Sequence, residues 1–248
     1  MGRVKALLTS KRDRIEQGLF VAEGLQGVRE ALQTQGSVET LFLTKAGIER
    51  LAKAGVSFPQ NLLVEVSERV AEAMSDAMTT QGIIAVCRIP NPDLTDLRRS
   101  EALRDSHLIF LNEIQDPGNA GTILRTADAM GISAIVTSPG SVDFYSPKVV
   151  RATAGSLWHV SLFLGVDLAG VRRQLPNHQV IILDGSAKKS FTEVELAKPA
   201  IWIFGNEARG MKEDVSGATH VSIPMPGRAE SLNLAAAAAI VMHEISRK

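Results

Sequence analysis

Apolar residues recur along the chain in two patterns, short near-continuous runs and longer stretches with helical spacing. In the C-terminal part, short apolar runs stand at residues 107–111, 133–137, 180–183, 201–204 and 220–223. Such runs are typical of strands buried on both faces of a largely parallel sheet. Helix-like stretches accompany them at residues 121–130, 146–154, 168–174 and 232–245. This alternation predicts an α/β domain with helices on both sides of its sheet.

The N-terminal part also alternates between helical and strand patterns. We expect helices or amphipathic stretches at residues 5–17, 28–32, 46–54 and 68–78, and strands at residues 19–23, 41–44, 62–66 and 82–88. The segment IPNPDLTDL at 89–97 follows, and its two prolines interrupt both helix and strand pairing. We therefore predict a smaller α/β domain over 1–95 and a second α/β domain over 96–248.

Composition places the chain among ordinary globular proteins. Hydrophobic residues make up 45% of it and charged residues 22%, which excludes disordered and fibrous classes. No window reaches the ~18 consecutive apolar residues of a membrane span, and the N-terminus lacks the apolar region of a signal peptide. We therefore expect a cytoplasmic protein without membrane contact. The single cysteine, Cys87, lies in the apolar run GIIAVCRI and is interpreted as a buried strand residue.

The net charge is zero, so only local clusters of charge can point to a nucleic-acid partner. The first 14 residues carry one acidic side chain, Asp13, against the basic residues Arg3, Lys5, Lys11, Arg12 and Arg14. Such a cluster fits a small phosphate-binding patch, but it also fits an ordinary solvated helix. Both interpretations stay open at this point.

Three segments rich in glycine and polar residues begin where predicted strands end, at residues 112–131, 204–211 and 223–244. Loops at strand ends are where α/β sheets bind ligands. Common nucleotide motifs do not fit them, because Met211 and Lys212 stand where a phosphate loop needs Lys and Ser or Thr, and no GxGxxG follows an early strand. The five histidines show no ligand spacing, so we predict no metal.

The three segments resemble the three motifs of the SpoU, or TrmH, family within the SPOUT methyltransferases. The matching residues are Asn119, Gly121 and Arg125 in the first, Gly205, Asn206 and Glu207 in the second, and the Ile-Pro-Met and Ser-Leu-Asn sequences from Ile223 and Ser231 in the third. The resemblance covers about residues 105–248. More loosely, the first part is similar to the N-terminal RNA-substrate domain of that family, through Lys11, Arg12, Gly18, Phe20, Glu23, Gly24, Gln81 and Gly82.

This resemblance implies a deep trefoil knot, an S-adenosylmethionine pocket formed by the last two motif loops, and a homodimer. The implied cofactor contacts are Gly205, Ile223, Met225 and Leu232. The implied catalytic residues are Arg125, Asn119, Ser231, Asn233 and Glu207. In the substrate domain, the candidate RNA contacts are Lys11, Arg12 and Arg14.

Chemistry restricts what some of these residues can do. A guanidinium keeps its proton at pH values up to ~12, so we expect Arg125 to bind the phosphate and stabilise the developing ribose oxyanion, rather than to act as a base. Glu207 either fixes its loop by accepting backbone hydrogen bonds or contacts the partner subunit. Glycine at 205 is expected to let the adenosine approach the backbone.

The resemblance thus implies an enzyme that methylates ribose 2′-hydroxyl groups of RNA, with large-subunit ribosomal RNA as the preferred substrate. Transfer RNA is the alternative substrate. Two other classes of function are weighed against it, a non-catalytic RNA-binding module on the same fold and a nucleotide-dependent transferase. Arg125, Asn119, Ser231 and Asn233 count against the first, and the missing phosphate-loop residues count against the second.

Overall fold

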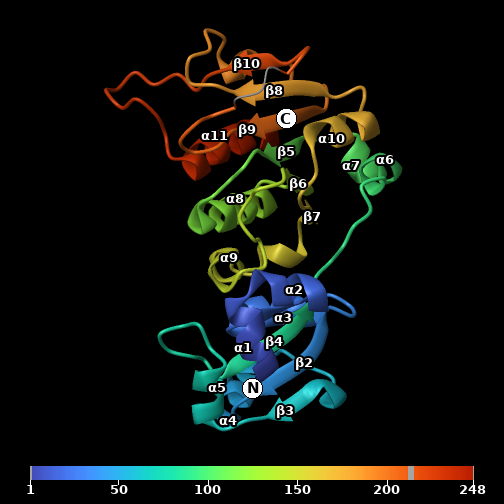
Figure 1. Cartoon of the computed structure of the whole chain (residues 1–248), viewed down its shortest axis with the longest axis vertical. Helices are drawn as coiled ribbons and strands as arrows, with labels where there is room; N and C mark the ends of the chain where they lie inside the picture. The colour runs from blue at the N-terminus through green and yellow to red at the C-terminus, as the bar shows by residue number, and fades with distance from the viewer. Residues whose placement is uncertain (1, 212–214, 248) are drawn as a thin grey trace. The chain divides into compact units, whose positions relative to one another are not determined.

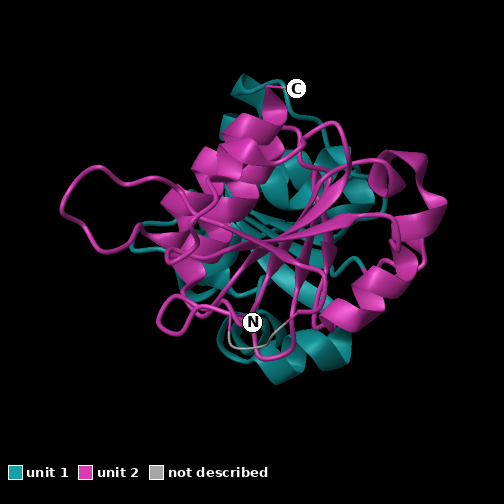
Figure 2. Ribbon diagram, turned by 90° about the horizontal axis from the view of Figure 1, so that it is seen from above, with its two compact units in different colours: residues 1–90, 143–158 teal, residues 91–142, 159–248 magenta. Residues whose placement is uncertain are grey.

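The computed structural model describes residues 2–211 and 215–247 (Figure 1). The chain forms two compact units (Figure 2), one of residues 1–90 and 143–158, and one of residues 91–142 and 159–248. The chain first leaves the first unit for the second between residues 90 and 91, inside the proline-containing segment 89–97. The assignment of 143–158 to the first unit differs from the predicted division at residue 95, which left all later residues in the second domain.

Within the described residues, the first unit has a four-stranded sheet with the order β1-β4-β2-β3. Its strands are β1 (Leu19–Glu23), β2 (Val38–Leu43), β3 (Leu63–Glu65) and β4 (Ile83–Arg88). β4 pairs antiparallel with β1 and β2, and β2 pairs in parallel with β3. Its helices are α1 (Gly2–Thr9), α2 (Lys11–Gln17), α3 (Leu25–Gln33), α4 (Lys45–Lys53), α5 (Glu68–Ala73) and α9 (Pro147–Ala152), with the 3-10 turns η1 (Gln60–Leu62) and η2 (Ser156–Trp158).

Two predicted helices of this unit are shorter in the structure. The helix expected over 5–17 is broken at Ser10, whose hydroxyl accepts a hydrogen bond from the amide of Asp13 at 3.2 Å and so caps the start of α2. The helix expected over 68–78 ends at Ala73, and the Ser75 hydroxyl then accepts the amide hydrogen of Ala77 at 3.0 Å. Such local bonds from serine compete with helical hydrogen bonding.

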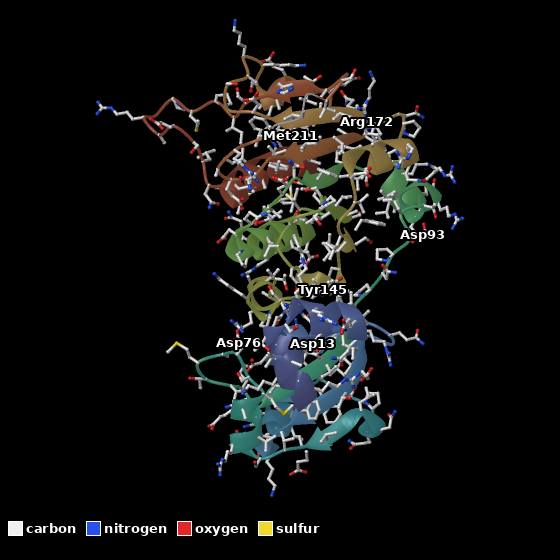
Figure 3. The ribbon with its side chains drawn as sticks, in the orientation of Figure 1. Asp13, Asp76, Asp93, Tyr145, Arg172 and Met211 are labelled. Atoms are coloured by element: carbon white, nitrogen blue, oxygen red, sulfur yellow. The ribbon has the colours of Figure 1, made fainter. Side chains whose placement is uncertain are left out.

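The first unit buries side chains on both faces of its sheet. On one face, alternate residues of β1 and β4 pack against α1 and α5 in a cluster of Val4, Leu7, Leu19, Val21, Ala71, Met74, Ile84 and Val86. From the opposite face of β1, the ring of Phe20 lies 4.9 Å from that of Tyr145 and 5.9 Å from that of Trp158, centroid to centroid (Figure 3 labels Tyr145). Residues 143–158 therefore complete the core of the first unit.

The second unit contains a parallel sheet whose described strands run in the order β10-β8-β9-β5-β6-β7. These strands are β5 (Leu108–Leu111), β6 (Ala134–Thr137), β7 (Ser161–Phe163), β8 (Gln179–Leu183), β9 (Ala200–Phe204) and β10 (Thr219–Val221). Its helices are α6 (Asp96–Arg99), α7 (Glu101–Arg104), α8 (Pro117–Ala129), α10 (Leu168–Gln174) and α11 (Leu234–Ser246), with the 3-10 turn η3 (Phe191–Glu193). The predicted α/β class and parallel sheet are confirmed. β7 was missed because its three residues are too short for a recognisable apolar run, and the implied knot stays a prediction.

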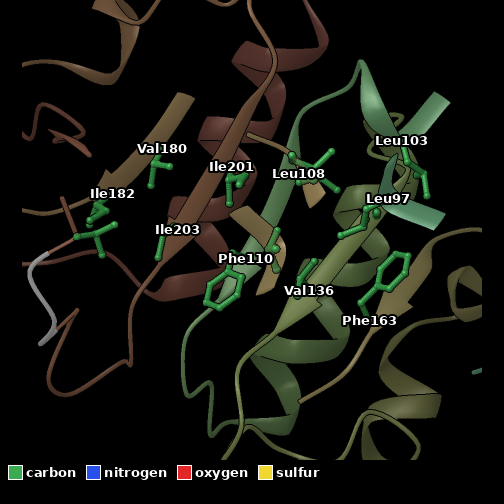
Figure 4. Close-up of a cluster of buried hydrophobic side chains, with 14 residues drawn as sticks. Leu97, Leu103, Leu108, Phe110, Val136, Phe163, Val180, Ile182, Ile201 and Ile203 are labelled. Atoms are coloured by element: carbon green, nitrogen blue, oxygen red, sulfur yellow. The ribbon is translucent and has the colours of Figure 1, made fainter. Parts of the chain in front are cut away.

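The central strands of this sheet are wholly buried, and alternate apolar side chains of β5, β6, β8 and β9, those on one face of the sheet, pack into one cluster (Figure 4). The strand order also decides which loops meet. β5 and β9 are neighbours, and just beyond them the amide of Asn112 donates to the carbonyl of Phe204 at 2.8 Å. The loops that follow β5 and β9 therefore start side by side at the carboxyl edge of the sheet, where open α/β sheets bind ligands.

Candidate functional site

A cavity of about 400 Å³ lies at the carboxyl ends of β8 and β9. Its volume is within the range of ~300–1,000 Å³ that is typical of small-molecule sites. The predicted cofactor contacts all line it, as do the predicted catalytic residues other than Arg125: Gly205, Ile223, Met225, Leu232, Asn119, Glu207, Ser231 and Asn233. The three loops that carry the motifs thus form one site.

The loop after β5 turns into α8 at Asp116. The carboxylate of Asp116 accepts the amide hydrogen of Asn119 at 2.7 Å, and Pro117 occupies the first helical position. Both are standard features of a helix start. α8 therefore begins four residues earlier than the predicted helix at 121, and Asn119 lies in its first turn, at the edge of the cavity.

Glu207 connects the loop after β9 to this helix start. Its carboxylate accepts hydrogen bonds from the backbone amides of Gln115 and Asp116, with the shortest donor–acceptor distance 3.2 Å, and from Nδ2 of Asn119 at 3.4 Å. A carboxylate is favourable there because the unpaired amides at a helix start attract negative charge. These contacts are the ones expected if Glu207 fixes the loop.

Asn119 also contacts the third motif. Its Oδ1 accepts a hydrogen bond from Nδ2 of Asn233 at 2.9 Å. Asn233 in turn caps α11, because its Oδ1 accepts the amide hydrogens of Ala235 at 2.9 Å and Ala236 at 3.2 Å. Side-chain hydrogen bonds between Glu207, Asn119 and Asn233 therefore link all three motif loops, although Asn119 and Asn233 are 114 residues apart.

Asn206 shapes the turn that follows β9. Its buried side chain accepts the amide hydrogens of Ala208 and Arg209, and Nδ2 donates to the carbonyl of Glu113 at 2.9 Å. Its backbone exchanges two hydrogen bonds with Gly210. Sequence reasoning gave Asn206 no role, although asparagine is a frequent turn-forming residue.

Glycine is required at 205 for a reason that differs from the predicted one. A Cβ atom on Gly205 would lie 2.3 Å from the carbonyl carbon of Gly210 and 2.5 Å from the amide nitrogen of Met211. The close approach is therefore between two segments of the same turn. Gly205 also lines the cavity, so its backbone faces whatever ligand binds there.

Glu113, in the loop after β5, has a left-handed backbone with φ +53°. This conformation costs a residue with a side chain roughly 1–2 kcal/mol. The backbone is held by a hydrogen bond from its amide to the Ser138 hydroxyl at 2.7 Å, and its carbonyl accepts from Asn206. The carboxylate forms an ion pair with Arg209, with Oε2 2.6 Å from Nη2. Neither Glu113 nor Arg209 was singled out from the sequence.

Arg125 lies on α8 with its side chain exposed, and it is not among the described residues that line the cavity. The structure of one chain therefore does not bring Arg125 together with the other predicted catalytic residues.

The predicted RNA contacts are in the first unit, on α2. Lys11 and Arg12 are exposed, and Arg12 pairs with Glu16 at 2.6 Å. Arg14 is buried and pairs with Asp143 at 2.7 Å. The expectation that Arg14 contacts RNA is therefore corrected, because its guanidinium points into the unit and is already paired.

Other groups with chemical potential are placed in the interior. Cys87 is buried in β4, as predicted, and burial raises the pKa of its thiol to about 12. Burial lowers the pKa of His107 and of His178. Among the described residues, no three His, Cys, Asp or Glu side chains gather as a metal site would require. None of the described helices has the length and apolar character needed to span a bilayer.

Fold and site together define an α/β domain with a small-molecule cavity at the carboxyl edge of a parallel sheet. Residues 106–243 match the model of the SpoU rRNA methylase family, and residues 3–85 match the MRM3-like substrate binding domain. The first match covers more than half of the chain. This protein belongs to the SpoU rRNA methylase family.

Individual relatives are similar over nearly the whole length. The 23S rRNA (guanosine(2553)-2′-O)-methyltransferase RlmP of Bacillus subtilis (strain 168) is 30% identical over 96% of this chain and 92% of its own. The 23S rRNA (uridine(2479)-2′-O)-methyltransferase of Streptomyces viridochromogenes is 28% identical over 98% of this chain and 88% of its own. Among solved structures, the AdoMet-bound rRNA methyltransferase from Sinorhizobium meliloti has a TM-score of 0.83 and 30% identity, covering 99% of this chain and 93% of that one.

Proposed function

We propose that this protein uses S-adenosylmethionine to methylate a ribose 2′-hydroxyl of large-subunit ribosomal RNA in the cytoplasm. The main support for this proposal is that side-chain hydrogen bonds join the three motif loops around a single cavity. The chain that carries these loops belongs to the SpoU rRNA methylase family. Two relatives that match nearly the whole chain are named as 2′-O-methyltransferases of 23S rRNA, which supports this substrate over transfer RNA.

The cavity fits S-adenosylmethionine in size and in chemistry. Leu183, Phe204, Ile223 and Leu232 offer apolar surface for an adenosine ring, and Gly205 leaves its backbone open. The solved relative from Sinorhizobium meliloti is described as AdoMet-bound. When bound, the cofactor would supply a methyl group on a positively charged sulfur, which is already a good leaving group.

The protein's own contribution would then be mainly to position the ribose. Ser231, exposed at the cavity, is the side chain that we assign to orienting the ribose. Asn233 is exposed there too, but its amide is bonded to Asn119 and to the start of α11, so we assign it to holding the loop that presents Ser231. The Asn119 side chain is hydrogen-bonded to Glu207 and Asn233, and the Glu207 carboxylate also accepts from backbone amides, so we assign both residues to holding the loops rather than to touching the reacting atoms. Correct placement of the 2′ oxygen in line with the methyl group can supply much of the rate enhancement.

Arg125 is proposed to act across a homodimer interface. Its side chain is exposed on α8, outside the cavity of its own chain. α8 packs against α11, whose sequence is almost wholly apolar. Even with this contact, the side chain of Ile240 on α11 remains 38% exposed. A second copy that covers these helices would bury this apolar surface and could bring its Arg125 to the phosphate and the developing oxyanion.

The first unit is proposed to bind the RNA. Its match to an MRM3-like substrate binding domain supports this role. Lys11 and Arg12 remain as candidate phosphate contacts, because both side chains are exposed on α2. Arg14 is no longer a candidate.

The proposal is tested by mapping 2′-O-methyl groups across total RNA from cells with and without the gene. We expect one or a few sites in large-subunit rRNA to lose methylation, and purified protein with S-adenosylmethionine to restore them on unmodified transcripts. If only transfer RNA lost 2′-O-methyl groups, transfer RNA would be the substrate in place of ribosomal RNA. A complete absence of methyl transfer, with RNA binding intact, would instead favour the non-catalytic RNA-binding module.

A further inference from the structure

The ion pair between Glu113 and Arg209 lies beside the cavity but is not explained by cofactor binding. Its two side chains are 44% and 49% exposed, and neither belongs to the described cavity wall. In the chain, however, Arg209 stands between Glu207 and Gly210, which both line the cavity. The partly exposed pair is therefore next to the cavity wall, at its rim.

Arg209 is presented by a rigid backbone. Its amide donates to the buried side chain of Asn206, and the turn is closed by the two backbone hydrogen bonds between Asn206 and Gly210. The turn therefore fixes the start of a long cationic side chain whose end remains partly in solvent. A guanidinium held in this way is well suited to bind a carboxylate or a phosphate, because its fork of donors matches the oxygens of either group.

Glu113 supplies such an anion from within the protein. Its left-handed backbone is unfavourable for a residue with a side chain, yet it is fixed by the hydrogen bonds to Ser138 and Asn206. As a result the carboxylate is held at 2.6 Å from the guanidinium. It occupies the position that a phosphate oxygen would take if RNA reached this rim.

We propose that Arg209 binds a backbone phosphate of the RNA substrate and that Glu113 occupies its guanidinium until this phosphate displaces the carboxylate. The inference rests on the proposed function, since it requires an RNA substrate at the cavity. Because a phosphate must displace the Glu113 carboxylate before it can bind Arg209, a weakly bound or misplaced phosphate does not gain this contact. The ion pair therefore disfavours wrong RNA substrates.

The two residues then affect RNA binding in opposite directions. Arg209→Gln should weaken binding of an unmodified large-subunit rRNA transcript about tenfold and reduce the slope of log K against log salt by about 1, because one phosphate contact is lost. Glu113→Gln should tighten binding roughly two- to fivefold, as expected for removing a competing partner in an exposed ion pair. Arg209→Lys, which keeps the charge but not the fork, should lie between wild type and Arg209→Gln.

The double variant separates this role from a general charge effect. If Glu113 acts through Arg209, Glu113→Gln has no effect on RNA affinity in the Arg209→Gln background. Methyl-transfer kinetics give a second measurement, in which Arg209→Gln raises KM for RNA and leaves kcat nearly unchanged. Thermal unfolding of each variant checks that the folds are equivalent.

Weakened binding in both single variants would overturn the inference, because the pair would then only brace the two loops. A Glu113→Gln effect that persists without Arg209 would overturn it too. Wild-type protein that binds the transcript but transfers no methyl group would contradict the proposed function alone, since the affinity comparison needs no methyl transfer.

Discussion

Arg14 and Asp143 form a buried ion pair in which Nη2 and Nε of the arginine lie 2.7 and 2.8 Å from the same carboxylate oxygen. The other carboxylate oxygen accepts the amide hydrogen of Tyr145 at 2.9 Å, and the guanidinium also donates to the carbonyl of Leu7. The pair joins residues 129 positions apart. It ties the N-terminal helices to the segment 143–158, whose chain enters the first unit directly at Asp143.

Removing one partner of this pair should therefore destabilise the protein strongly. Asp143→Ala leaves the guanidinium of Arg14 buried without its counter-charge, and we expect the free energy of unfolding to fall by about 3 kcal/mol or more. Urea unfolding followed by circular dichroism measures this loss. Replacing both residues by apolar ones, as in Arg14→Met with Asp143→Leu, should recover most of it.

The exposed pair Arg12 and Glu16 on the same helix provides the matched control. Glu16→Ala should change the free energy of unfolding by less than about 0.5 kcal/mol, because both side chains are in water. Similar small losses for Asp143→Ala and Glu16→Ala would show that burial of the Arg14 pair contributes little.

The parts of the fold that could be predicted are those with a local signal. Strands such as β9 read AIWIF, and the motif loops follow them directly, so the sequence placed Asn119, Glu207 and Asn233 on one edge of one sheet. Ser10 and Asp116 are typical residues for the start of a helix, and each does cap one here. The spacing of apolar residues, from which the helices were predicted, does not depend on such caps, so these two helix starts were not predicted.

The parts that could not be predicted depend on contacts between distant residues. No residue near Tyr145 or Trp158 in the sequence indicates that their rings pack on Phe20, which lies more than a hundred residues earlier in the chain but in the same unit. Arg14 resembles its neighbours Lys11 and Arg12 as a basic helical residue, and only Asp143 distinguishes it. The left-handed backbone of Glu113 likewise has no signal, since glycine and asparagine are the residues expected there.

If α2 contacts RNA, the exposed basic residues Lys11 and Arg12 should determine part of the salt dependence. Changing both to glutamine should reduce the slope of log K against log salt by up to about 1.8, because up to two phosphate contacts are lost. Filter binding of an unmodified rRNA transcript at several salt concentrations measures this slope. Lys198→Gln, in an exposed pair with Glu195 in the second unit, is the control and should leave it unchanged. An unaltered slope in the double variant would make α2 an ordinary solvated helix.

Two histidines of the second unit should make the free energy of unfolding decrease as the pH is lowered below about 6.5. Burial is the main cause that lowers the pKa of both His107 and His178. His107 is held as a neutral ring, since its Nδ1 accepts from Nε1 of Trp202 at 3.3 Å while Nε2 lies 3.1 Å from the carbonyl oxygen of Leu196. Below an ordinary pKa of about 6.5 the unfolded chain takes up these protons more readily than the folded one, so acid favours unfolding.

This dependence is measured by urea unfolding at pH 7.5 and pH 5.5 in the wild type and in His107→Asn. The variant should lose less stability between the two pH values, because one of the two groups no longer titrates. An equal loss in both proteins would mean that His107 does not contribute.

Arg125 is expected to act in the site of the partner subunit, and complementation between two inactive variants tests this arrangement. Arg125→Ala should lower kcat about a hundredfold or more while leaving the Kd for S-adenosylmethionine nearly unchanged, because the arginine is outside the cavity of its own chain. Leu232→Trp should block the cavity without unfolding the chain, since Leu232 is 38% exposed and lines it. Gly205 is a poor choice for this purpose, because a side chain there would collide with Gly210.

When the two variants are mixed equally and allowed to exchange subunits, mixed dimers contain one intact site, so about a quarter of the wild-type activity should return. Arg125→Lys, which keeps a positive charge, should retain more activity than Arg125→Ala. A mixture as inactive as its components, or a fully active monomer in sedimentation at micromolar concentration, would contradict the shared site.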